Sequence, residues 1–112
     1  MSDSLTPFVV RQHDSLEAAM LVIEGNRHHS VVVVDDENVV VGTLSDGDVR
    51  KAILDRRLLS TPVEAVMNTN FVALGPDEGD RAREYFERDR DYLFLVPIVD
   101  ADGKLLEIQT AY

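Results

Sequence analysis

The sequence repeats itself, and this repeat limits how the chain can fold more than any other feature does. Asp14 matches Asp77 at an offset of 63 residues. The run Val33-Val34-Asp35 matches Ile98-Val99-Asp100 at an offset of 65, which fits an insertion of two residues between the first helix and the first buried strand. Repeated units of this kind bury their apolar faces against each other. We therefore expect two similar halves, residues 1–61 and residues 62–112.

The first half predicts the order strand, helix, strand, strand, helix. Apolar spacing, valine-rich runs, capping boxes and turn residues support these assignments. In chain order we expect an extended segment at Leu5–Val10, a helix from Ser15 that stops at Gly25, a buried strand at Ser30–Val34, its hairpin partner at Val39–Leu44, and a short helix after Ser45.

The second half follows the same order, after a short helix with Thr61 as N-cap and Pro62 at its first position. The remaining elements are an extended segment at Phe71–Leu74, a helix that starts at Gly75-Pro76-Asp77, a strand at Leu93–Val99 and a return strand at Lys104–Ile108. The last helix of this half is missing. We therefore expect a truncated chain or a part of a longer protein, with apolar surface that a second chain covers.

Composition narrows the class of protein. The 112 residues are 45% hydrophobic and 29% charged, which is typical of a globular chain. There is no cysteine, so disulfides and Cys-ligated metal sites are excluded. A polar N-terminus and the lack of a long apolar run predict a cytoplasmic protein without a signal peptide. The net charge of −10 argues against nucleic acid and anionic membranes as partners.

The sequence Val39–Arg50 is central, because a buried strand there runs directly into a helix start. Ser45 and Asp48 have the spacing of a capping box. A hydroxyl and a carboxylate beside the free amides of a helix N-terminus also suit the phosphate and the diol of a ribose phosphate. Two interpretations therefore remain open at this corner: a helix cap alone, or a cap that also binds a ligand.

Other polar clusters favour simpler interpretations. His28 and His29 are adjacent, so in an extended segment they point to opposite faces, and no third metal ligand accompanies them. The acidic turn at residues 35–38 lacks the ligand order of a calcium loop. The basic residues after the corner are either a solvated helix face or part of a binding site. With no paired nucleophile and base, no metal set and no Walker glycine loop, we expect no enzyme, no metal and no cofactor.

The duplicated unit resembles the cystathionine-β-synthase (CBS) domain pair, also called a Bateman module. The resemblance covers nearly the whole chain, and its form at the corner is most similar to pairs attached to sugar-nucleotide transferases and sugar-phosphate isomerases. It rests on four stretches: Val31–Asp35, Val41–Arg50, Thr61–Met67 and Val96–Gly103.

The resemblance implies an α/β (α+β) fold of tandem βαββα units, in which two small sheets pack around a pseudo-twofold axis and leave two clefts. Such clefts take adenosine nucleotides, here AMP, ADP or ATP, and such modules form dimers. Carried over by position, Ser45 contacts phosphate or ribose and Asp48 contacts the ribose hydroxyls. Backbone near Val10 and near Ser30-Val31 lines the base pocket, and Arg50 reaches a phosphate.

The second half departs from this pattern. Thr110 stands in the place of Ser45, but the chain stops one residue before the partner of Asp48, and Glu107 replaces the family glycine. Thr110 is therefore the candidate of an impaired second cleft. The expected function is a non-catalytic regulatory module that binds an adenosine nucleotide, forms a homodimer and modulates an attached or partner enzyme. The alternative is a structural, dimerising pair without a ligand; S-adenosyl compounds are a further ligand class.

Overall fold

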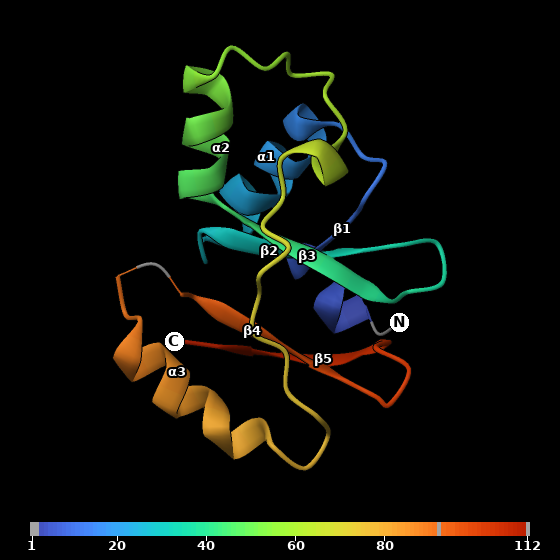
Figure 1. Ribbon diagram of the computed structural model, residues 1–112, viewed down its shortest axis with the longest axis vertical. Coiled ribbons are helices and arrows are strands. Elements are labelled where there is room, and N and C mark those ends of the chain that lie inside the picture. Colours follow the sequence, from blue (N-terminus) through green and yellow to red (C-terminus); the bar gives the residue numbers. More distant parts are fainter. Residues whose placement is uncertain (1–2, 92, 112) are drawn as a thin grey trace.

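The computed structural model describes residues 3–91 and 93–111 and has four layers. Two helices cover a three-stranded sheet, this sheet packs on a two-stranded sheet, and one helix covers the other side (Figure 1). The first helix layer and the three-stranded sheet contain β1 (Val9–Arg11), α1 (Leu16–Asn26), β2 (Ser30–Val34), β3 (Val40–Ser45) and α2 (Asp46–Leu54). The remainder contains α3 (Ala82–Arg88), β4 (Leu95–Val99) and β5 (Leu105–Thr110). The expected α/β fold of two small packed sheets is confirmed.

The first sheet has the order β1-β2-β3, with β1 parallel and β3 antiparallel to β2. Every residue of β2 is buried, because both faces of this strand are covered. Val31 and Val33 belong to the core beneath α1 and α2, whereas Val32 and Val34 belong to the core between the two sheets. A run of valines without polar alternation is the pattern that such a strand requires.

The second sheet repeats this arrangement. β4 and β5 form an antiparallel hairpin, and Leu74 bridges Ile98 in the parallel direction, as β1 pairs with β2. A bulge lies between Ile98 and Val99, at the same repeat position as the bulge between Val33 and Val34. β4 begins two residues later than expected, and β5 extends two residues beyond its expected end.

The two sheets join edge to edge through two reciprocal hydrogen bonds. The amide of Val40 donates to the carbonyl of Gly103, and the amide of Leu105 donates to the carbonyl of Asn38, both at 3.0 Å. Each bond is the copy of the other at the offset of 65 residues found in the sequence. This reciprocity is the local signature of the pseudo-twofold axis.

Two boundaries in the first half differ from the expectation. Only the last two residues of the expected extended segment Leu5–Val10 lie in a strand, because a 3-10 helix spans Asp3–Phe8 and pairing starts only after Pro7, which has no amide to donate. Gly25 does not end α1. The helix continues to Asn26, whose side-chain amide donates to the carbonyls of Pro7 and Ser30, and the left-handed turn falls on Arg27.

Two helix starts in the second half also differ. The helix expected at Pro62 is only a 3-10 turn, Val63–Ala65, because the amides of Val63 and Glu64 donate to carbonyls of the first half. Asp77 does not start α3, which begins at Ala82 after a 3-10 turn. Before that turn, the amide of Gly75 and the guanidinium of Arg81 hold the pKa of Glu78 below its usual value.

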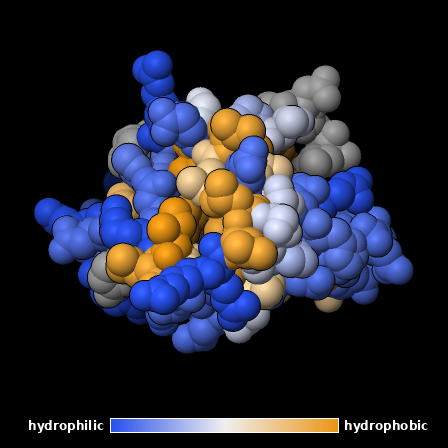
Figure 2. Space-filling model, turned by 90° about the horizontal axis from the view of Figure 1, so that it is seen from above, coloured by the Kyte–Doolittle hydropathy of each residue, from blue (hydrophilic) through white to orange (hydrophobic). Residues whose placement is uncertain are grey.

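The outer surface of the first half carries an unusual number of exposed apolar side chains. Seen from above, they gather in the middle of the face formed by the helix layer and are ringed by polar residues (Figure 2). We call this the leucine surface; its members are Leu21, Ile53, Leu54, Leu58 and Leu59, which are 44–75% exposed. Among the described residues, no helix is long and apolar enough to cross a membrane.

Gly42 is required where the linker between the halves crosses β3. A Cβ built on Gly42 would lie 2.6 Å from the sulfur of Met67 and 3.0 Å from the carbonyl oxygen of Asn68. We expect Gly42→Val to destabilise the fold by about 1–3 kcal/mol through overpacking. Gly25→Ala is the matched control, because nothing lies within 4 Å of its Cβ, and it should stabilise by about 0.4–1 kcal/mol. Urea unfolding of both variants measures the change in the free energy of unfolding. Equal changes in the two variants would contradict the requirement for glycine at position 42.

Candidate functional site

The corner between β3 and α2 forms the capping box that the sequence predicts. The hydroxyl of Ser45 accepts from the amide of Asp48 at 3.2 Å, and Oδ2 of Asp48 accepts from the amide of Ser45 at 3.0 Å. The Ser45 hydroxyl also donates to Oδ2 of Asp48 at 3.0 Å. Oδ1 of Asp48 makes no hydrogen bond to the part of the chain that the structure describes. One carboxylate oxygen is thus used by the cap, and the other carries no hydrogen bond within the described part of the chain.

Asp48 faces a groove between α2 and the linker that joins the two halves. The helical period places Lys51 and Ala52 on the same side of α2 as Asp48, and all three line the groove together with Met67 and Asn68. Its volume is about 350 Å³, near the lower end of the range for small-molecule sites. The linker is held firmly here, because Thr43 and Asn68 exchange two backbone hydrogen bonds of 3.0 and 2.8 Å.

The groove holds both signs of charge. Lys51 and Arg57 bring two cations to it, and Asp48 and Asp55 bring two carboxylates. Arg50, the expected phosphate contact, is exposed on α2 but does not line this groove. It lies two residues beyond Asp48, which turns it to the far side of the helix. Of Arg50 and Lys51, Lys51 is therefore the cation that lines the groove.

A second set of contacts ties the corner to the other half. Nδ1 of His29 lies 2.8 Å from Oδ2 of Asp46, the first residue of α2, and the amide of Asp46 donates to the carbonyl of His29. The His29 ring also lies 5.1 Å from the ring of Phe94, just before β4. These contacts fix the N-terminus of α2 against the start of both β2 and β4.

Of the other residues expected to line the nucleotide pocket, Ser30 and Val31 lie beside the corner, whereas Val10 lies far from it. Ser30 is buried and pairs with Ser45, and Val31 pairs with Leu44. Val10 pairs with Val33 on the far side of β2, three positions along the sheet from Ser45. At about 3.4 Å per residue and about 4.8 Å per strand, its backbone lies about 14 Å from that of Ser45.

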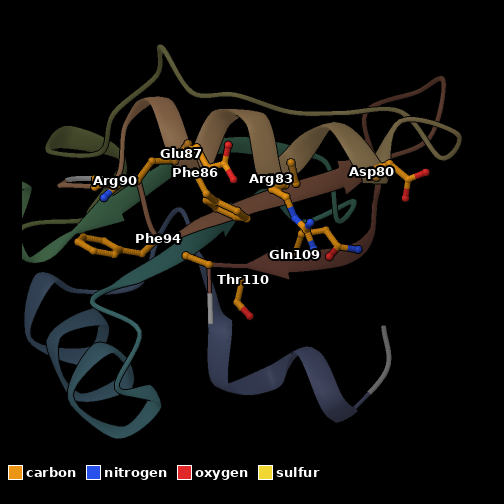
Figure 3. Close-up of a pocket in the computed structure, with 12 residues that line it drawn as sticks. Asp80, Arg83, Phe86, Glu87, Arg90, Phe94, Gln109 and Thr110 are labelled. Atoms are coloured by element: carbon orange, nitrogen blue, oxygen red, sulfur yellow. The ribbon is translucent and has the colours of Figure 1, made fainter.

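Thr110 occupies the position in β5 that Ser45 has in β3, since it pairs with Leu95 as Ser45 pairs with Ser30. It lines a different and larger cavity of about 920 Å³ between α3 and the end of β5 (Figure 3). Phe86, Phe94 and Gln109 line the same cavity. This is a broad hollow, not a second copy of the groove beside Asp48.

No group of three or more potential metal ligands occurs among residues 3–91 and 93–111. Sequence reasoning missed several residues around the corner, above all His29, Asp46, Lys51 and Met67. The helical spacing from Asp48 could have indicated Lys51. The contact of His29 with Phe94 has no local signal, because it joins residues from different halves.

A model of the CBS domain matches residues 1–55. The structure of the CBS domain protein PAE2072 from Pyrobaculum aerophilum, complexed with AMP, aligns with 93% of this chain and 79% of its own, with a TM-score of 0.73 at 18% identity. The chain is a CBS domain pair.

Two further proteins show where such pairs occur. Staphylococcus aureus OpuCA aligns with 94% of this CBS pair and 86% of its own chain, with a TM-score of 0.75 at 21% identity. Arabinose 5-phosphate isomerase GutQ of Salmonella typhi is 32% identical over 92 residues. That match covers 81% of the CBS pair but only 28% of the isomerase. The pair thus spans little more than a quarter of this relative.

Ser45 caps α2 as Ser15 caps α1, so the two serines allow a matched comparison of how much each cap stabilises the fold. We expect Ser45→Ala to lower the free energy of unfolding by about 1 kcal/mol, the usual cost of losing a cap. Ser15→Ala should cost about as much, because the Ser15 hydroxyl accepts from the amide of Ala18 at the start of α1. Thermal unfolding of both variants checks this. No loss in Ser45→Ala would show that the hydrogen bonds of the corner are dispensable for stability.

Proposed function

We propose that this CBS pair is a regulatory module that binds an adenosine nucleotide in the groove beside Asp48. The observation that carries the proposal is that Asp48 lines this groove while only its Oδ2 is held by Ser45, which leaves Oδ1 without a hydrogen bond among the described residues. A carboxylate held in this way can accept hydrogen bonds from both hydroxyls of a ribose. The AMP complex of a protein with the same fold supports the choice of ligand class.

The phosphate of the nucleotide would meet two kinds of partner. Amide groups in the first turn of α2 and the positive end of its dipole favour an anion. Lys51 and Arg57 add cationic side chains to the groove. Ser45 contributes its hydroxyl at the same corner, and Ser30 lies beside it in the sheet.

Regulation would follow from the position of the linker. Met67 and Asn68 line the groove and also belong to the segment that joins the two halves. A nucleotide between α2 and this linker favours whichever arrangement of the halves gives it more contacts, and it shifts the population toward that arrangement. The match to the isomerase GutQ suggests a sugar-phosphate isomerase as the attached or partner enzyme, with the CBS pair itself non-catalytic.

Nucleotide binding is tested by thermal unfolding with AMP, ADP and ATP. A ligand at a hundred times its dissociation constant adds about 2.7 kcal/mol, which raises the midpoint by on the order of 10 °C in a domain of this size. We expect Asp48→Ala to remove this rise, while Ser15→Ala, with a similar loss of cap stability, keeps it. A rise that survives in Asp48→Ala, or no rise with any of the three, would overturn the proposal.

A second function, dimerisation, is favoured by the leucine surface. A patch of exposed apolar side chains on a protein surface typically marks an interface. Helical spacing suggests an asymmetric rim: Glu17 and Glu24 of α1 lie four and three positions from Leu21, whereas Arg50 and Lys51 of α2 lie four and three positions from Leu54. In a twofold dimer that packs α1 of one copy on α2 of the other, the symmetry repeats this contact on the opposite side. Acidic and basic rims would then meet around a shared apolar centre.

The dimer is tested by light scattering after size exclusion. We expect Leu54→Glu to give monomers without unfolding the chain, because Leu54 is 75% exposed. Leu106→Glu is the matched control: Leu106 is 48% exposed but lies on β5, outside the leucine surface. A parent chain that stays monomeric at millimolar concentration, or equal effects of both changes, would contradict this interface.

A further inference from the structure

The charged side chains along the groove beside Asp48 limit which nucleotides it can accept. The side of the groove that α2 and its C-terminal cap form is lined at positions i, i+3, i+4 and i+7 by Asp48, Lys51, Ala52 and Asp55. This spacing forms one stripe along a helix, so the groove follows the axis of α2. At a rise of about 1.5 Å per residue, Asp55 lies about 10.5 Å along this axis from Asp48.

The two ends of the groove differ. Near Asp48 the linker crosses β3 (Figure 1), and Asn68 exchanges two backbone hydrogen bonds with Thr43 there. At the other end the lining residues are Asp55 and Arg57, and both are exposed. When the ribose is held by Asp48, a lengthening phosphate chain therefore extends along the groove toward the C-terminal end of α2.

The charges toward this end have no partner within the described part of the chain. Arg11 pairs with Asp36 and Arg81 pairs with Glu78, but Lys51, Asp55 and Arg57 form no ion pair with any described residue. Their charges are therefore not neutralised by the protein, and they act on whatever enters the groove.

The balance of these charges favours one phosphate group over several. Lys51 and Arg57 bring two positive charges, and a phosphate monoester carries about −1.5 to −2 at pH 7. Each further phosphate brings more negative charge toward Asp55 and toward the last turn of α2, whose free carbonyls form the negative end of the helix dipole. The volume of about 350 Å³, small for a ligand site, favours the same choice.

We propose that Asp55 is a specificity-determining residue, which makes the groove prefer a nucleoside monophosphate to the diphosphate and the triphosphate. The inference rests on the nucleotide binding proposed above and adds the number of phosphates to it. Lys51 holds the first phosphate, and the carboxylate of Asp55 repels the outer ones. The signal that the module reads is then the amount of monophosphate relative to triphosphate.

Isothermal titration of the full chain with adenosine, AMP and ATP, in the presence of EDTA, tests this role. We expect Asp55→Asn to tighten the binding of ATP relative to AMP by about twofold to fivefold, the effect of one exposed charge. Asp55→Lys should change the same ratio by on the order of tenfold. Adenosine, which has no phosphate, should bind equally to the parent chain and to Asp55→Asn.

Asp77→Asn is the matched control for the loss of one negative charge. Asp77 is exposed in the loop before α3 and does not line the groove. Its replacement should leave the ratio of ATP to AMP affinity unchanged, and an equal effect of Asp77→Asn and Asp55→Asn would contradict a local role of Asp55.

Two results would overturn the inference and leave nucleotide binding intact. The first is an unchanged ratio in both Asp55 variants. The second is weaker binding of ATP to Asp55→Asn when Mg²⁺ replaces EDTA, because Asp55 would then hold the metal ion of a bound triphosphate instead of repelling it. Absence of binding of all three ligands to the parent chain would instead overturn the proposed nucleotide site itself, and this inference with it.

Discussion

The fold depends on a single strand that is apolar on both faces. The four valines of β2 are each at most 3% exposed, two under the helices and two against the second sheet. Full burial of a valine side chain stabilises by about 1.5–3 kcal/mol, and this strand gains on both sides only when both layers are present. The first half therefore cannot satisfy β2 alone. The requirement for a second sheet explains why the chain repeats its unit instead of stopping after one.

The hydrogen bonds that join the second sheet to the first follow the sequence repeat. The amides of Val40 and Leu105 each donate to the turn of the other half. These turns, with Asn38 and Gly103 at positive φ, are the places where backbone groups remain unpaired within each hairpin. Reciprocal pairing satisfies both groups together. The pseudo-twofold axis thus follows from two requirements. The backbone groups of both turns need hydrogen-bond partners, and the apolar core beside them must be buried.

Whether a feature could be predicted from the sequence depends on how far apart along the chain the interacting residues lie. The Ser45–Asp48 cap and the valine strand are encoded locally, and both were predicted correctly. The turn at Val63–Ala65 was not, because its amides are drawn to Gln12 and Asp14, and no local pattern reveals this competition. The contact of His29 with Phe94 joins the two halves and is equally invisible to periodicity. Residues near the corner were thus predictable only where a local pattern links them, either the cap itself or the helical spacing from Asp48.

The two halves differ at the last strand of each hairpin, β3 in the first half and β5 in the second. In the first half, Gly42 leaves room for Met67, and the linker closes the groove beside Asp48. Its counterpart Glu107 is exposed and accepts a hydrogen bond from Gln109, which itself lines the larger cavity between α3 and the end of β5. A bulky carboxylate in place of a glycine removes the close approach on which the first groove depends. The divergence of β5 from β3 therefore leaves the two halves with cavities of different size and lining.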